Sequence, residues 1–152
     1  MNHNERPIGW TTIDEAKRLV AAQVDLNSAD MSYVEGPLGW ALSTSPSLAV
    51  KKKLFSFRQG YEWPCWSMGA LLQLLPKQIV LYGVTFYMAL VGNEKHRWSI
   101  CYANPDVVEP FFSFKKETIV EACIEMITAL KVAEKEGKAI ALWPKGNEEG
   151  GE

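Results

Sequence analysis

The sequence predicts an α+β fold in which a small antiparallel sheet has about three helices packed on one face. Two amphipathic stretches with helical periodicity, residues 13–24 and 117–136, lie toward the two ends of the chain. Between them, residues 79–103 alternate apolar and polar side chains around a Gly-Asn turn, the pattern of a β-hairpin. The order of helix, strands, helix, hairpin and helix therefore favours one α+β domain over residues 1–144.

The first helix has a clear start signal. Thr12 followed three residues later by Glu15 forms a capping box, usually worth about 1 kcal/mol. A short strand is predicted over residues 32–35. Residues 36–47 contain two glycines, two prolines and four hydroxyl residues, which indicates a long loop or an irregular hairpin at the surface.

A short apolar helix is predicted after Ser67, which has the side chain of an N-cap, and Pro76 ends it. Trp66 and Leu71 stand at the positions of a hydrophobic staple across its first turn. A helix of two turns cannot persist by propensity alone, so burial must hold it. Upstream, residues 49–60 read as a strand whose entry is basic.

The second half contains one continuous strand over 79–91, a turn, and a returning strand over 97–103. An irregular link bounded by Pro105 and Pro110 precedes the long helix, and Gly137 fits its C′ position.

Residues 139–143 fit an edge strand, and residues 145–152 are acidic and glycine-rich enough for a flexible tail.

The amino-acid composition excludes few functions, but it limits the partners and the cellular compartment that we expect. The 152 residues are 47% hydrophobic and carry a formal net charge of -2, so any nucleic acid or anionic lipid must bind to a local patch of charge.

Three widely spaced cysteines indicate buried thiols in a reducing compartment. The start lacks the apolar region of a signal peptide, and Pro76 interrupts the most apolar window. We expect a cytoplasmic protein without membrane contact.

Cys65 and His96 are weak candidates for a catalytic pair. A cysteine at a helix start has a favoured thiolate, and a histidine on a later hairpin can serve as its base. However, Cys65 precedes the predicted cap, and no residue presents itself to orient His96. A buried cysteine beside tryptophans is the alternative interpretation.

A second candidate is a basic and aromatic strip for single-stranded nucleic acid, in which lysines contact phosphates and rings stack on bases. Its basic residues are Lys51, Lys52, Lys53 and Arg58. A lysine run at a sheet edge also prevents strand pairing between molecules. Asp30 is predicted to cap a turn, and no histidine cluster or second acid supports a metal or cofactor site.

Several segments together resemble a family of small proteins without an assigned activity that occur in phage, prophage and other mobile elements of gut bacteria. The segments are Ala16–Val20, Ser28–Met31 with Tyr33, Pro64–Ser67 with Leu71–Pro76, and Glu121–Cys123 with Met126 and Leu130. The family pattern has Thr at position 28 and a small apolar residue at position 65. The resemblance implies that Asp30, Tyr33, Trp66 and Ser67 are the matching positions to test for more than a structural role.

These observations predict a non-enzymatic accessory protein of a phage or mobile element that binds another macromolecule, most simply a protein. We expect it in the cytoplasm of a bacterial host, without a cofactor. Two alternatives stay open: binding of single-stranded nucleic acid through the strip from Lys51 to Arg58, and a cysteine-dependent enzyme that uses Cys65.

Overall fold

A computed structural model describes residues 6–43, 62–93, 95, 97–141 and 143–144. The α+β class is confirmed: the described residues contain three α-helices, and their antiparallel strands form two sheets, of three and five strands, instead of one. The chain divides into two compact units, with the boundary between Leu71 and Leu72. The single domain over 1–144 and the packing of all helices on one face stay predictions. The strand predicted over 49–60 and the tail over 145–152 lie outside the described residues.

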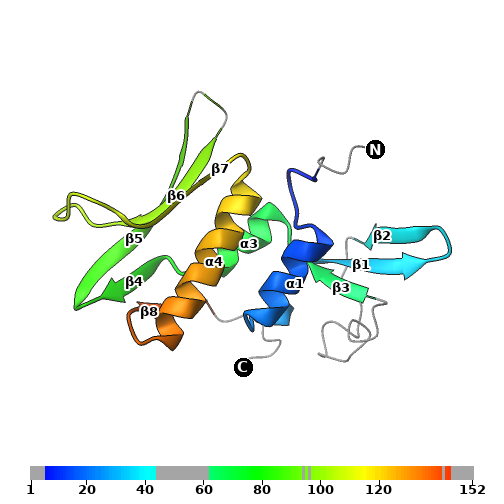
Figure 1. The fold of residues 1–152 in the computed structure, drawn as a ribbon, viewed down its shortest axis with the longest axis horizontal. Coiled ribbons are helices and arrows are strands. Elements are labelled where there is room, and N and C mark those ends of the chain that lie inside the picture. Colours follow the sequence, from blue (N-terminus) through cyan, green and yellow to red (C-terminus); the bar gives the residue numbers. More distant parts are fainter. Residues whose placement is uncertain (1–5, 44–61, 94, 96, 142, 145–152) are drawn as a thin grey trace. The chain divides into compact units, whose positions relative to one another are not determined.

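The first unit contains the three-stranded sheet, in the order β2-β1-β3 (Figure 1). Its strands are β1 (Met31–Gly36), β2 (Gly39–Ser43) and β3 (Glu62–Cys65). Strand β1 confirms the strand predicted over 32–35, whereas β3 was not predicted because Pro64 discourages a strand assignment. Pro64 is tolerated because β3 pairs only with β1 among the described strands, so its missing N–H interrupts no second ladder.

Helix α1 (Ile13–Ala21) packs beside β3 and has the predicted capping box. The Oγ1 atom of Thr12 accepts the Glu15 amide at 3.1 Å, and the Glu15 carboxylate accepts the Thr12 amide at 2.9 Å. The helix ends three residues before the predicted position 24. Gln23 has φ of 62°, and the amide of Val24 bonds to the Leu19 carbonyl, as in a Schellman motif. Because this left-handed position holds Gln and not Gly, the sequence contained no stop signal.

Strands β1 and β2 form a tight hairpin, so residues 36–43 are more regular than predicted. Gly36 pairs with Gly39, which leaves only Pro37 and Leu38 in the turn. Proline fixes a negative φ at the first turn position, and Gly39 closes the turn with φ of 106°. Residues 44–47 lie outside the described part of the chain.

The second unit contains the five-stranded sheet, in the order β7-β6-β5-β4-β8. Its strands are β4 (Gln78–Leu81), β5 (Val84–Gly92), β6 (Trp98–Ala103), β7 (Phe111–Lys116) and β8 (Ile140–Ala141). Helix α4 (Ile119–Lys135) packs against β6, β7 and β8 (Figure 1). Strands β5 and β6 confirm the hairpin in the second part of the predicted range 79–103, and β8 confirms an edge strand within the predicted range 139–143.

The continuous strand predicted over 79–91 is wrong, because a two-residue turn divides it. Tyr82 and Gly83 have φ values of 51° and 79°, and Leu81 pairs with Val84. Positive φ at both central residues is the geometry of a type I′ turn, whose twist suits a hairpin. Tyrosine is rare at the first of these positions, so the sequence pattern did not reveal the turn.

Strand β7 is missed by the sequence analysis, which places only an irregular link bounded by Pro105 and Pro110 before the helix predicted from residue 117. The register against β6 shifts between Ile100 and Tyr102, and Phe112 has φ of 50°. One extra residue in β7 therefore forms a bulge, which disrupts the alternation that marks a strand.

Both ends of α4 follow local signals. Thr118 is the N-cap, with its Oγ1 atom accepting the Glu121 amide at 3.1 Å. Gly137 has φ of 75° at the predicted C′ position, and the Lys138 amide donates to the Ala133 carbonyl at 2.8 Å. Among all the residues that the structure describes, no helix is long and apolar enough to cross a membrane.

We predict that Gly92→Ala destabilises the second unit by about 1–3 kcal/mol, because a Cβ at this position would lie 2.9 Å from the Trp98 ring. Urea unfolding followed by tryptophan fluorescence measures the change. The matched control is Gly9→Ala, whose Cβ meets nothing within 4 Å. In a Trp98→Leu background the Gly92→Ala change should cost much less, and an equal cost there would contradict the steric explanation.

Candidate functional site

Three of the predicted site residues, Tyr33, Cys65 and Trp66, contact Thr11, which is fully buried. The Thr11 amide donates to the Trp66 carbonyl at 3.0 Å, and the Trp66 amide donates to Thr11 Oγ1 at 3.1 Å. This pairing joins the segment before α1 to the segment between β3 and α3 (Met68–Leu74). It brings together residues that are 55 positions apart.

Trp66 has no exposed surface, and its polar atom is satisfied. The indole Nε1–H donates to Ser28 Oγ at 2.8 Å. A buried indole N–H without an acceptor would cost roughly 1–3 kcal/mol, so position 28 needs a hydroxyl or another acceptor. This contact explains Trp66 as a structural residue.

Asp30 and Ser67 form the start of α3. The two carboxylate oxygens of Asp30 accept the Ser67 amide at 2.9 Å and the Ser67 hydroxyl at 2.5 Å. Ser67 Oγ in turn accepts the Ala70 amide at 3.1 Å, which confirms the predicted N-cap. Asp30 thus holds the cap of a helix distant in sequence, whereas the sequence predicted only a local turn cap.

Tyr33 is also held by Thr11, since the Tyr33 hydroxyl donates to the Thr11 carbonyl at 2.7 Å. Burial is the main cause that raises the pKa of Tyr33 to about 12. The phenol therefore keeps its proton near neutral pH and acts here as a hydrogen-bond donor.

Cys65 is fully buried at the end of β3. Its Sγ atom lies 3.5 Å from Thr11 Oγ1, which donates to it, and 3.6 Å from the Thr11 carbonyl. Burial raises the pKa of the Cys65 thiol to about 11, so the reactive thiolate is scarce at neutral pH. These features argue against a nucleophile. His96, the proposed base, lies outside the described residues.

The predicted basic strip of Lys51, Lys52, Lys53 and Arg58 also lies outside the described residues, so it stays a prediction. Within the ranges that the structure describes, no group of three His, Cys, Asp or Glu side chains is placed to hold a metal ion.

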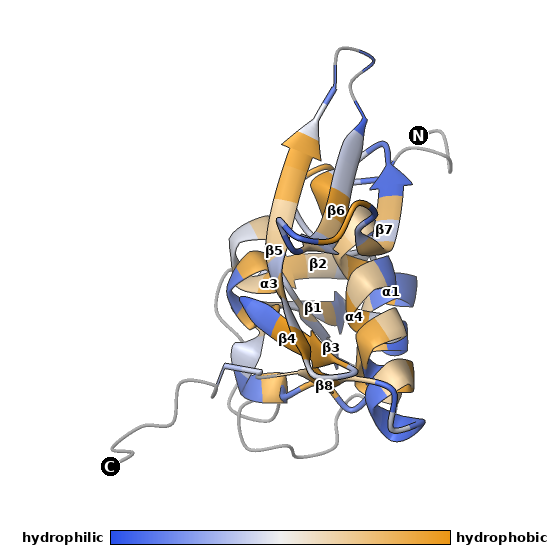
Figure 2. Ribbon diagram, turned by 90° about the vertical axis from the view of Figure 1, so that its left-hand side faces the viewer, coloured by the Kyte–Doolittle hydropathy of each residue, from blue (hydrophilic) through white to orange (hydrophobic). Residues whose placement is uncertain are grey.

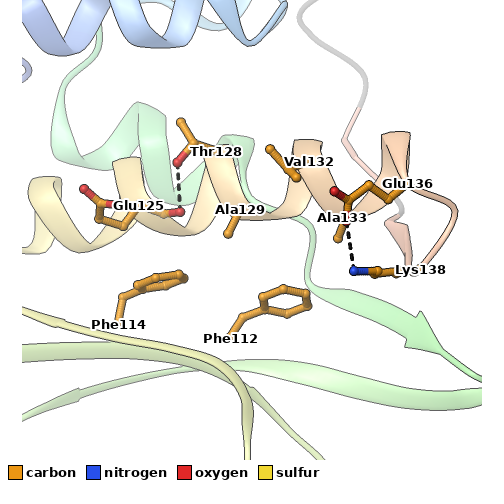
Figure 3. A pocket seen from close by; sticks show the side chains of 9 residues that line it. All are labelled: Phe112, Phe114, Glu125, Thr128, Ala129, Val132, Ala133, Glu136 and Lys138. Atoms are coloured by element: carbon orange, nitrogen blue, oxygen red, sulfur yellow. Dashed lines mark hydrogen bonds and ion pairs between the residues drawn. The ribbon is translucent and has the colours of Figure 1, made fainter.

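A shallow groove lies in the second unit between β7 and α4, with a volume of about 470 Å³ (Figure 3). Phe112 and Phe114 form one wall, and Ala129 faces them from α4. At one end Lys138 pairs with Glu136 at 3.0 Å. Glu125, Thr128 and Glu136 add polar side chains to this lining, and the sequence could not reveal the groove because β7 was missed.

The β1–β2 hairpin carries a third feature, the apolar hairpin tip, defined as Val34, Leu38 and Trp40. Leu38 is 102% exposed, and Val34 and Trp40 are each 40% exposed. Trp40 pairs with Glu35, whereas Val34 pairs with Ala41, so the two exposed side chains occupy opposite faces of the hairpin. The sequence singled out this segment only as a surface loop.

No protein-family model, curated protein or solved structure matches the chain.

We predict that iodoacetamide near neutral pH labels Cys101 before Cys65 in the folded protein, because Cys65 and Cys123 are buried and Cys101 is only partly covered. Peptide mass spectrometry after timed labelling measures each site. All three thiols should react in urea, which is the control. Labelling of native Cys65 faster than free cysteine would restore the nucleophile hypothesis.

We also predict that Asp30→Ala and Ser67→Ala each destabilise the protein by about 1 kcal/mol, because each removes a helix cap contact. The double variant should cost less than the sum of the single changes, since both remove the same interaction. Urea unfolding measures this coupling. Asp106→Ala is the control, because no side-chain contact is seen for Asp106 in the described structure. Strict additivity would show that Asp30 does not act through Ser67.

Proposed function

We propose that the protein works by binding another protein through the apolar hairpin tip. The supporting observation is the full exposure of Leu38 at a tight turn, with the partly exposed Trp40 on one face of the hairpin and Val34 on the other. Large exposed apolar side chains on a protruding turn can be enclosed by a partner from both faces. Aromatic anchors such as Trp40 often provide much of the binding energy.

The hairpin suits this role because it is already ordered before binding. Five residue pairs join β1 to β2, and Pro37 restricts the turn between them. A partner would therefore spend little free energy on ordering the loop. Covering the side chain of Leu38 would contribute about 1.5–3 kcal/mol, which corresponds to roughly 10- to 100-fold in affinity.

We further propose that this binding protein is an accessory protein of a phage or mobile element, located in the cytoplasm of its bacterial host. This part rests on the resemblance at Asp30, Tyr33, Trp66 and Ser67. In this chain all four residues hold the fold together. A shared scaffold without a shared reactive group is what a family of binding proteins would retain, and it requires no cofactor.

The enzyme alternative has less support, because Cys65 is enclosed and lacks a described base. Single-stranded nucleic-acid binding through residues 51–58 remains an alternative hypothesis.

We predict that Leu38→Ser weakens partner capture at least tenfold without lowering the thermal midpoint. Leu38 has no buried surface to lose, so only intermolecular contacts should change. A tagged pull-down from nuclease-treated bacterial lysate, quantified by mass spectrometry, measures the loss for each captured protein.

The matched control is Val108→Ser, because Val108 is 99% exposed and lies in the second unit. A photo-crosslinking residue at position 38 should form an adduct with the same partner, and one at position 108 should not. Equal capture by both serine variants, or adducts at both positions, would refute the hairpin tip as the contact.

A further inference from the structure

The turn between β5 and β6 is built around Asn93. The Asn93 amide donates to the Arg97 carbonyl at 3.0 Å, which closes the turn. The Asn93 side-chain oxygen accepts the amides of Lys95 at 3.0 Å and Arg97 at 3.2 Å. The backbone positions of both cationic residues are therefore fixed by one side chain.

Strand β7 adds a third cation to this end of the sheet. Lys115 pairs with Ser99 across the β6–β7 ladder, and Lys116 pairs with Trp98. Because the buried Ile100 and Tyr102 of β6 face α4 and side chains alternate along a strand, Ser99 and Lys115 share the outer face. Arg97 directly precedes β6 and lines the same hollow as Lys115. Lys116 points to the other face.

These residues surround a hollow of about 410 Å³, lined by Asn93, Lys95, Arg97 and Lys115. None of the three cations makes a salt bridge to an acid among the described residues. Figure 2 shows this end of the hairpin as hydrophilic beyond the apolar body of β5. Three like charges around one hollow repel each other, and an anionic ligand would relieve that repulsion.

The outer face of the same sheet also presents an aromatic ring. Tyr87 is 53% exposed and Val91 is 55% exposed. Val91 pairs with Ser99, so both side chains share the face of Lys115. At about 3.3 Å per residue, Tyr87 lies roughly 13 Å along β5 from Val91. This distance lets an extended nucleic-acid strand, whose phosphates are regularly spaced, contact both Tyr87 and the cationic hollow.

We propose that the outer face of the five-stranded sheet binds single-stranded nucleic acid, with Lys95, Arg97 and Lys115 on its phosphates and Tyr87 stacked on a base. Arginine suits this chemistry because its planar guanidinium can donate two hydrogen bonds to one phosphate. A half-exposed ring on the face of a sheet accepts a base of any identity. The proposed site includes none of the residues of the hairpin tip and none of residues 51–58.

The experiment measures binding of the full chain to a fluorescein-labelled oligothymidine by anisotropy over a range of salt concentrations. Three phosphate contacts predict a slope of about −2 in a plot of log affinity against log salt, at about −0.7 for each contact. A fourfold rise in salt should thus weaken binding about 20-fold. The double variant Arg97→Gln/Lys115→Gln should reduce the slope to about −0.7.

Two variants test whether binding uses Tyr87 and whether it uses the outer face of the five-stranded sheet. Tyr87→Leu keeps an apolar strand residue and should weaken binding at least fivefold by removing stacking. Lys116→Gln removes the same charge as Lys115→Gln from the opposite face and should change affinity less than twofold. Thermal midpoints confirm that each variant is folded.

The proposal is overturned if the oligonucleotide does not bind, or if Lys115→Gln and Lys116→Gln weaken binding equally. It is also overturned if Tyr87→Leu has no effect or if a duplex of the same length binds more tightly. Leu38→Ser should leave oligonucleotide binding unchanged, so failure of this proposal is distinguishable from failure of the hairpin proposal.

Discussion

The pairing of Thr11 with Trp66 is the constraint on which the first unit depends. Thr11 is fully buried, and each of its polar groups has a partner: its amide and Oγ1 bond to the Trp66 backbone, and its carbonyl accepts the Tyr33 hydroxyl. A buried polar residue is stable only when its hydrogen bonds are made. Here those bonds connect the chain before α1, the centre of β1 and the entry to α3. Loss of the pairing would therefore leave several buried groups unsatisfied at once.

The contacts around Thr11 and Trp66 also explain why the conspicuous residues of the sequence have structural roles. Cys65, Trp66 and Ser67 follow one another, and each contacts a different part of the same scaffold. Catalysis would require a thiolate and an open approach to it, but Cys65 has no exposed surface. A short, unusual motif can mark a junction in a fold as readily as an active site. Functional arguments must therefore rest on side chains that reach the surface.

Local signals predicted the fold where a few neighbouring residues determine the backbone. The Thr12 capping box, the Ser67 cap and Gly137 all satisfy helix-end groups within a turn or two, and all three were predictable. The features that were missed depend on uncommon backbone choices, such as positive φ at Tyr82, or on distant partners. Asp30 and Ser67 are 37 residues apart, so nothing near Asp30 in the sequence indicates its role.

The two proposed surfaces would differ in what they recognise and how salt affects them. Contacts by Leu38 and Trp40 would bury apolar area; such contacts depend little on ionic strength and could select one protein partner. Contacts by Arg97 and Lys115 with phosphates would be strongly screened by salt and insensitive to base sequence. With a net charge of only -2, the chain as a whole adds little long-range attraction, so the cations must act locally. A chain that carries both surfaces would raise the concentration of its protein partner near nucleic acid without any contact between the two ligands.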